Sequence, residues 1–159
     1  TKIEVDDRYL SKCEDLAQIV AILRVRPPKS EHAEVTVEEP NRLTHQFVRL
    51  MCCLSLVLNR DTVDDEVMRR VQKVSLDTGR GVVLELMRLL YNADTPLAVR
   101  DIAYSIDRTE DYTRKLLRFL QKIRVVNNTI VKGNKSAFPP KKALWQLSDK
   151  MRILCTGVL

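Results

Sequence analysis

Several patterns that mark common protein functions are missing from this sequence of 159 residues. It has only two histidines, and no Ser-His-Asp set, metal-binding box or glycine-rich phosphate loop is visible. Aromatic residues make up 5%, which leaves little material for the base-stacking surface of a single-strand binder. No apolar run approaches the ~18 residues of a membrane span, and no signal-peptide pattern opens the sequence. We therefore expect no enzyme activity from this chain alone, no cofactor and no membrane association.

The cysteines argue against a metal site. None of the four stands in C-x-x-C spacing or beside a cluster of histidines, so a zinc site is not expected. Two of them lie inside a continuous apolar stretch, where thiols usually behave as small buried hydrophobes. We expect all four to be reduced, which indicates an intracellular location, in the cytoplasm, nucleoid or nucleus. They are Cys13, Cys52, Cys53 and Cys155.

Positive charge is concentrated in the second half of the chain. Residues 1–78 hold 12 Lys and Arg against 14 Asp and Glu, whereas residues 79–159 hold 15 against 7. The net charge of +6 thus comes from the second half, which suits a polyanionic partner, although a basic surface that only serves solubility is the alternative. Two glycines within residues 77–81 mark a hinge, so we predict two domains, 1–78 and 79–159. The first residue is Thr1 rather than Met, so we expect a domain of a longer protein.

Apolar residues at helical spacing predict three helices in the first half. They cover residues 7–24, about 41–58 and about 63–76. Alternating apolar residues over 33–38 could form a short edge strand. Thr62, with Asp65 three residues later, is expected to cap the third helix.

The second half is predicted to contain a helix-turn-helix followed by a β-hairpin. A helix that begins at Val82 precedes it. Residues 98–106 form a short helix, 107–109 a tight turn and 110–123 a longer helix. Strand-like stretches at 125–126 and 129–131 follow, and residues 143–147 return as a strand. Ser148 is expected to cap a final helix that ends near Leu154.

Finer expectations concern the long helix and the hairpin. Asp107 or Thr109 is expected to cap the helix, and Asn127-Asn128 tolerates the positive φ of a hairpin turn. Residues 133–142 are expected to form a flexible tip, and Trp145 is expected to be a core anchor. The predicted buried stripe of the helix is Tyr112, Leu116, Phe119, Leu120 and Ile123.

The run from Leu116 to Val126, at the end of the long helix, resembles the recognition helix of the winged-helix family passing into its first wing strand. The resemblance covers about residues 81–149 and implies a helix-turn-helix with a small β-hairpin wing. The expected fold is therefore mainly α, with an N-terminal three-helix segment and a C-terminal winged helix-turn-helix domain.

The first half resembles the helical lid of AAA+ ATPases, such as replicative helicases of the minichromosome maintenance kind and initiators. The stretches 39–43 and 61–67 carry the resemblance, which covers about residues 7–74. It implies that Arg42 reaches nucleotide phosphates and that the partners include the ATPase core of a parent chain or other subunits. A helical scaffold that supports or dimerises the second half is the alternative. Walker motifs are missing, so ATP would be hydrolysed elsewhere in a parent protein.

Together these features predict a double-stranded DNA-binding module of a replication-associated or regulatory AAA+ ATPase. The long helix would enter the major groove while basic residues around it contact phosphates. Glu110 and Asp111 place negative charge at the helix end that often meets the bases; they either read cytosine amino groups or mark a face that meets protein. The alternatives are a protein-interaction or dimerisation module and a winged-helix transcriptional regulator. The expected DNA-binding residues are Arg100, Arg108, Thr113, Arg114, Arg118, Gln121, Lys132, Lys135, Lys141 and Lys142.

Overall fold

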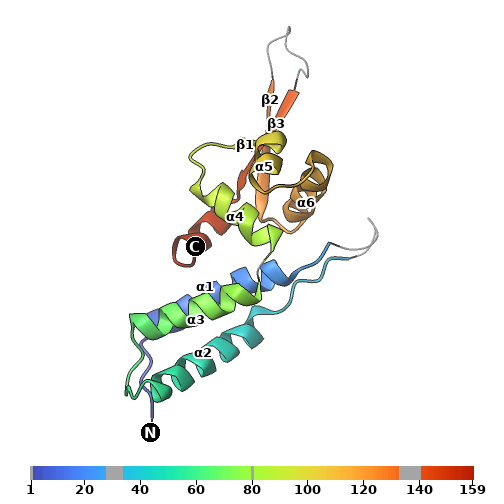
Figure 1. Cartoon of the computed structure of the whole chain (residues 1–159). Helices are drawn as coiled ribbons and strands as arrows, with labels where there is room; N and C mark the ends of the chain where they lie inside the picture. Colours follow the sequence, from blue (N-terminus) through green and yellow to red (C-terminus); the bar gives the residue numbers. More distant parts are fainter. Residues whose placement is uncertain (1, 28–33, 80, 133–140) are drawn as a thin grey trace. The chain divides into compact units, whose positions relative to one another are not determined.

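The computed structural model describes residues 2–27, 34–79, 81–132 and 141–159, with only the backbone of Lys132 and Lys141. The described part is mainly helical and has one small antiparallel sheet (Figure 1). The helices are α1 (Asp7–Arg24), α2 (Pro40–Val57), α3 (Asp65–Thr78), α4 (Val82–Asn92), α5 (Val99–Ser105), α6 (Glu110–Lys122) and α7 (Asp149–Thr156). The strands are β1 (Leu97–Ala98), β2 (Val126–Lys132) and β3 (Lys141–Leu147). Each helix expected from the sequence is present within two or three residues of its expected ends.

The chain divides into two compact units. Residues 1–80 and 156–159 form what we call the helical unit, and residues 81–155 form the mixed unit. The division lies two residues after the expected boundary. No sequence pattern indicates that the last four residues belong to the helical unit, where the side-chain amide of Gln72 donates to the carbonyl of Val158 at 2.6 Å.

In the helical unit, α2 runs antiparallel to α1 and α3, and the three helices pack on one another (Figure 1). Asp6 caps α1 by accepting from the backbone N–H of Arg8 at 2.9 Å. The buried hydroxyl of Tyr9 donates to Asp65 at 3.0 Å and so links the starts of α1 and α3. Burial, and then this hydrogen bond, raise the pKa of Tyr9. No described helix combines the length and apolar composition needed to cross a bilayer.

Two local expectations for the helical unit are wrong. The residues of the expected edge strand that the structure describes, 34–38, have no regular structure, because no described strand lies beside them to pair with. The cap of α3 is Asp64, which accepts from the N–H of Val67 at 2.9 Å, and not Thr62. Thr62 instead lies in a short parallel bridge with Glu4, which holds its backbone extended.

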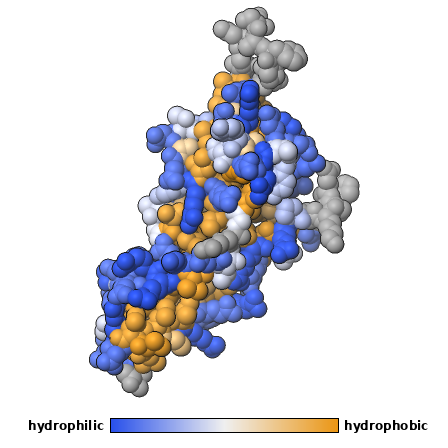
Figure 2. Space-filling model, viewed as in Figure 1, coloured by the Kyte–Doolittle hydropathy of each residue, from blue (hydrophilic) through white to orange (hydrophobic). Residues whose placement is uncertain are grey.

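The cysteines are free thiols, but they are not all buried. Burial raises the pKa of both Cys13 and Cys155 to about 11, so these two thiols are protonated at neutral pH. Cys53 is exposed, contrary to expectation, because the second half of α2 is apolar over much of its circumference and only one side packs. Leu56 and Val57 are exposed for the same reason, at 49% and 81%. Figure 2 shows apolar surface on the helical unit.

The mixed unit has a three-stranded antiparallel sheet in the order β1-β3-β2. β2 and β3 pair from Val126 opposite Leu147 to Lys132 opposite Lys141. Asn127 and Asn128 therefore lie within β2, and the hairpin turn expected at these two residues is wrong. The chain reverses earlier, at Arg124, whose φ of 61° ends the turn after α6 and starts the strand. Positions 133–140 of the expected flexible tip lie outside the described residues. Lys141 and Lys142, the last two residues of the expected tip, belong to β3.

The core of the mixed unit confirms two expectations. Trp145 is 4% exposed and acts as a core anchor. The Ser148 hydroxyl accepts from the N–H of Met151 at 3.4 Å, as a cap of α7 does, and donates to the carbonyl of Arg124 at 2.9 Å. This second bond joins the turn after α6 to the start of α7.

Candidate nucleic-acid interface

The exposed side of α6 is the most highly charged helix face in the described part of the mixed unit. The helix begins at a cap, because the Thr109 hydroxyl accepts from the N–H of Tyr112 at 3.3 Å. One side is buried and consists of Thr113, Leu116, Leu117, Phe119 and Leu120. The opposite side carries four cations, two carboxylates and an amide, which we call the charged face of α6. Its residues are Glu110, Asp111, Arg114, Lys115, Arg118, Gln121 and Lys122.

Two ion pairs link residues one turn apart on the charged face of α6. Arg114 lies 3.8 Å from Glu110, and Lys115 lies 2.8 Å from Asp111. The hydrogen bond from Lys115 holds the pKa of Asp111 below its ordinary value, and Arg114 and Arg118 add to this effect. All four paired side chains are at least 44% exposed, so water screens the pairs strongly. The cations remain accessible to an anionic partner.

The turn between α5 and α6 adds further exposed groups. Asp107 has a φ of 51°, and Arg108 donates to its carbonyl at 2.7 Å. Arg108, Thr109 and Tyr112 line an open hollow of about 510 Å³ together with Asp107. On α5, Tyr104 is 90% exposed and lies one turn after the exposed Arg100. A side chain this large and this exposed has no packing role in the domain, so it is available to a partner.

Most of the residues expected to bind DNA lie on the surface of the mixed unit. Arg114, Arg118 and Gln121 share the charged face of α6, whereas Arg100 and Arg108 lie on α5 and the turn. The expected residues with exposed side chains are Arg100, Arg108, Arg114, Arg118, Gln121 and Lys142. Lys132 and Lys141 are opposite one another at the described end of the hairpin, and Lys135 lies outside the described residues.

Thr113 was wrongly assigned to this surface. Its side chain is 0% exposed, so a surface partner cannot touch it. Tyr112, which was expected in the buried stripe, is 45% exposed. The buried side of α6 follows the helical spacing i, i+3, i+4 and i+7 at positions 113, 116, 117 and 120. Because Thr113 is small and polar, it was not recognised in the sequence as part of this buried side.

Sequence reasoning also missed two exposed groups on the same elements. Lys115 lies on the charged face of α6, and a helical projection of residues 110–122 would have found it. Tyr104 carried no sequence signal beyond its position off the apolar face of α5. Its importance depends on its exposed fraction, which only the structure gives.

In the helical unit, Arg42 is exposed and bound to a carboxylate. Its guanidinium donates to Glu38, which also pairs with Arg24 at 3.5 Å. The hydrogen bond from Arg42 lowers the pKa of Glu38, with a smaller contribution from Arg24. Arg42 is thus held at the start of α2 by a shared carboxylate.

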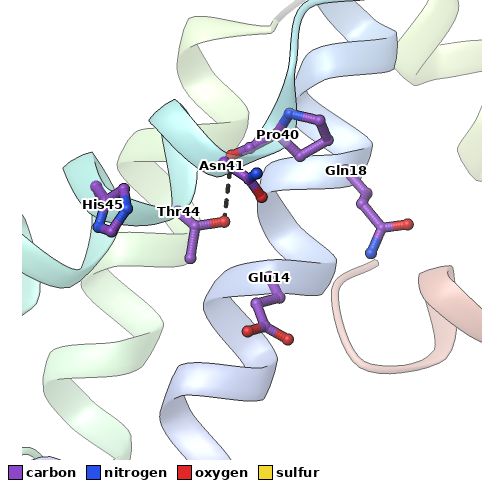
Figure 3. Close-up of a pocket in the computed structure, with 6 residues that line it drawn as sticks. All are labelled: Glu14, Gln18, Pro40, Asn41, Thr44 and His45. Carbon is purple, nitrogen blue, oxygen red and sulfur yellow. Dashed lines mark hydrogen bonds between the residues drawn. The ribbon is translucent and has the colours of Figure 1, made fainter.

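A hollow of about 480 Å³ lies between α1 and α2 (Figure 3). Glu14 and Gln18 reach into it from α1, and α2 contributes the rest of the lining. The lining residues are Glu14, Gln18, Pro40, Asn41, Thr44 and His45. Among the described residues no lysine or arginine lines this hollow, so it offers hydrogen-bonding groups but no strong anion site.

Comparison of the sequence with family models and curated proteins adds no relative to these observations. The sequence matches no model of a known protein family and no curated protein. The function is therefore inferred from the geometry and charge described above.

Proposed function

We propose that the mixed unit is a winged-helix module that binds double-stranded DNA, with α6 as the recognition helix in the major groove. The observation that supports this most strongly is the charged face of α6, because four accessible cations stand on one side of a helix whose other side is anchored in the core. A major groove about 12 Å wide accepts one α-helix.

The neighbouring elements fit the same proposal. The hairpin formed by β2 and β3 corresponds to the wing, and its described end carries Lys132, Lys141 and Lys142. Ten Lys and Arg against two Asp and Glu fall within residues 108–142. In this arrangement the wing lysines, Arg100 and Arg108 contact phosphates, which position the domain without reading sequence.

For the helical unit we propose the role of an AAA+ lid that precedes the DNA-binding module in the sequence. The three packed helices and the position of Arg42 in the first turn of α2 support this role. Arg42 would have to leave Glu38 to reach nucleotide phosphates, and the ATPase core would come from another part of a parent protein. The whole chain would then belong to a replication-associated or regulatory ATPase and act inside the cell.

A protein-interaction module is the second candidate, and the carboxylates of Glu110 and Asp111 favour it. They stand at the end of α6 that would face the bases, where most of their neighbours in DNA are acceptors or phosphates. A partner protein with basic residues would complement them.

Duplex binding across salt concentrations separates the two candidates. We expect the full chain to bind a random duplex with Kd ~10⁻⁴ to 10⁻⁶ M near physiological salt, measured by fluorescence anisotropy. The logarithm of affinity should fall linearly with the logarithm of salt concentration. If the chain does not bind the duplex, or if its affinity does not change with salt concentration, the result contradicts DNA recognition through phosphates and favours a protein partner.

A further inference from the structure

The first turn of α6 combines two features that oppose non-specific binding to phosphate. Glu110 and Asp111 stand on the same face as the cations, and each lies beside the cation four residues later, at 3.8 Å from Arg114 and 2.8 Å from Lys115. A phosphate that approaches Arg114 or Lys115 competes with a carboxylate and is also repelled by it. This turn is therefore the least attractive part of the charged face of α6 for a bare phosphate.

The carboxylates are not needed to hold the helix in place. Thr109 caps α6, and the buried side of the helix packs through Leu116, Leu117 and Leu120. Ion pairs as exposed as these contribute little to stability. Replacing both carboxylates by amides should thus leave the fold intact and change only the surface that a partner meets.

We propose that Glu110 and Asp111 determine the DNA specificity of α6; this inference rests on the proposed function of the mixed unit. In the major groove a carboxylate accepts a hydrogen bond from the N4 amino group of cytosine, whereas a phosphate offers it no donor. A duplex that presents cytosine amino groups to the first turn of α6 satisfies the carboxylates and releases Arg114 and Lys115 to bind DNA. A duplex that presents only acceptor groups to this turn meets the repulsion without this compensation.

The test compares the full chain with the double variant E110Q/D111N. Each is measured on random duplex and on a site selected by the wild-type chain from a random pool, by fluorescence anisotropy at two salt concentrations. The control E85Q/D94N also removes two negative charges, but from exposed positions of the mixed unit that lie outside α6. The variant E110D/D111E keeps both charges, and thermal unfolding followed by circular dichroism verifies that every variant folds.

We expect E110Q/D111N to bind random duplex about five- to tenfold more tightly than wild type at low salt, because two repulsive charges are removed at close range. Its salt slope should steepen by up to ~1.8, since two cations become free to meet phosphates. The ratio of the affinity for the selected site to the affinity for random duplex should fall. The control should change affinity much less, and E110D/D111E should keep most of the wild-type ratio.

Two results would overturn the inference. One is that E110Q/D111N behaves like the control on random duplex. The other is that it keeps the wild-type ratio of site to random affinity. Both presuppose that the wild-type chain binds duplex; if it does not, the proposed function itself fails.

Discussion

The side-chain amide of Gln121 donates to the Oδ1 atom of Asn128 at 3.0 Å, which ties the last turn of α6 to strand β2. The bond connects the helix proposed to read DNA with the hairpin proposed to touch phosphates. Both residues are exposed, so the bond competes with water. It fixes the orientation of Gln121 on the charged face of α6.

Replacing Asn128 by alanine tests this link. We expect N128A to lower the free energy of unfolding by about 0.5 kcal/mol, the low end of the net value of one hydrogen bond, because both partners are exposed. Urea unfolding measures the change. N127A is the matched control, because Asn127 is exposed on the same strand and makes no side-chain hydrogen bond that we find among the described residues. Equal losses in both variants would mean that the bond adds nothing to stability.

Thr113 offers a test of its placement in the core. Its hydroxyl oxygen has no hydrogen-bond partner in the described structure, although the side chain is fully buried. T113V replaces the hydroxyl by a methyl group of similar size, so we expect the free energy of unfolding to rise by about 1 kcal/mol. T113A, which leaves a small cavity, should instead be less stable than wild type. If T113V folds well but loses duplex affinity, Thr113 belongs to the DNA-binding surface and not to the core.

An ion-pair network at the start of α3 predicts a pH dependence of stability. Hydrogen bonds from Arg70 and then Arg60 lower the pKa of Glu66 to about 2 from an ordinary value of 4.5. The charged carboxylate is thus favoured in the folded state, and its contribution is fully present above pH 4.5 and lost as the pH falls through about 2. E66Q should be less stable than wild type at pH 7, and the difference should vanish near pH 2. The control E14Q alters an exposed glutamate of α1. The difference in free energy of unfolding between E14Q and wild type, measured by urea unfolding, should not shrink as the pH falls.

The wing lysines should contribute affinity without specificity. They stand at or beyond the described end of the hairpin, where phosphates are the expected neighbours. K135A/K141A/K142A should weaken binding about equally on every duplex and reduce the salt slope by up to ~0.9 for each phosphate that is no longer neutralised. Anisotropy titrations on two unrelated duplexes measure both quantities. A weakening confined to one sequence would mean that the hairpin reads bases.

Local patterns were sufficient to predict the helices but not the strand register. Apolar residues at helical spacing recur within each helix, so α1 and α6 could be read from their own sequences. The start of β2 depends on where the chain reverses after α6. The chain reverses at Arg124, whose backbone is left-handed. Residue preferences for hairpin turns instead favour a reversal at Asn127 and Asn128, three residues later. The cap of α3 was missed by two residues because the helix begins only at Asp65, so the residue that directly precedes it is Asp64, whereas Thr62 lies in the bridge to Glu4.

The candidate site was predictable as a region and not as a set of side chains. Charge and helical spacing placed Arg114 and Arg118 on the exposed side of α6. The burial of Thr113 and the exposure of Tyr104 depend on which residues of other elements fill the core, and a one-dimensional pattern does not contain this information.

Arg114 and Arg118 provide the most direct test of sequence recognition by α6. They lie one helical turn apart on a rigid element, and a bidentate contact from either to guanine is worth ~1–3 kcal/mol on a preferred site. The measurement is the ratio of affinities for a selected site and for random duplex, taken for R114A, R118A and the control R88A/K150A. We predict that at least one arginine variant lowers this ratio while the control leaves it unchanged. An unchanged ratio in both arginine variants would contradict base reading by α6 and make a protein partner the better explanation of its charged face.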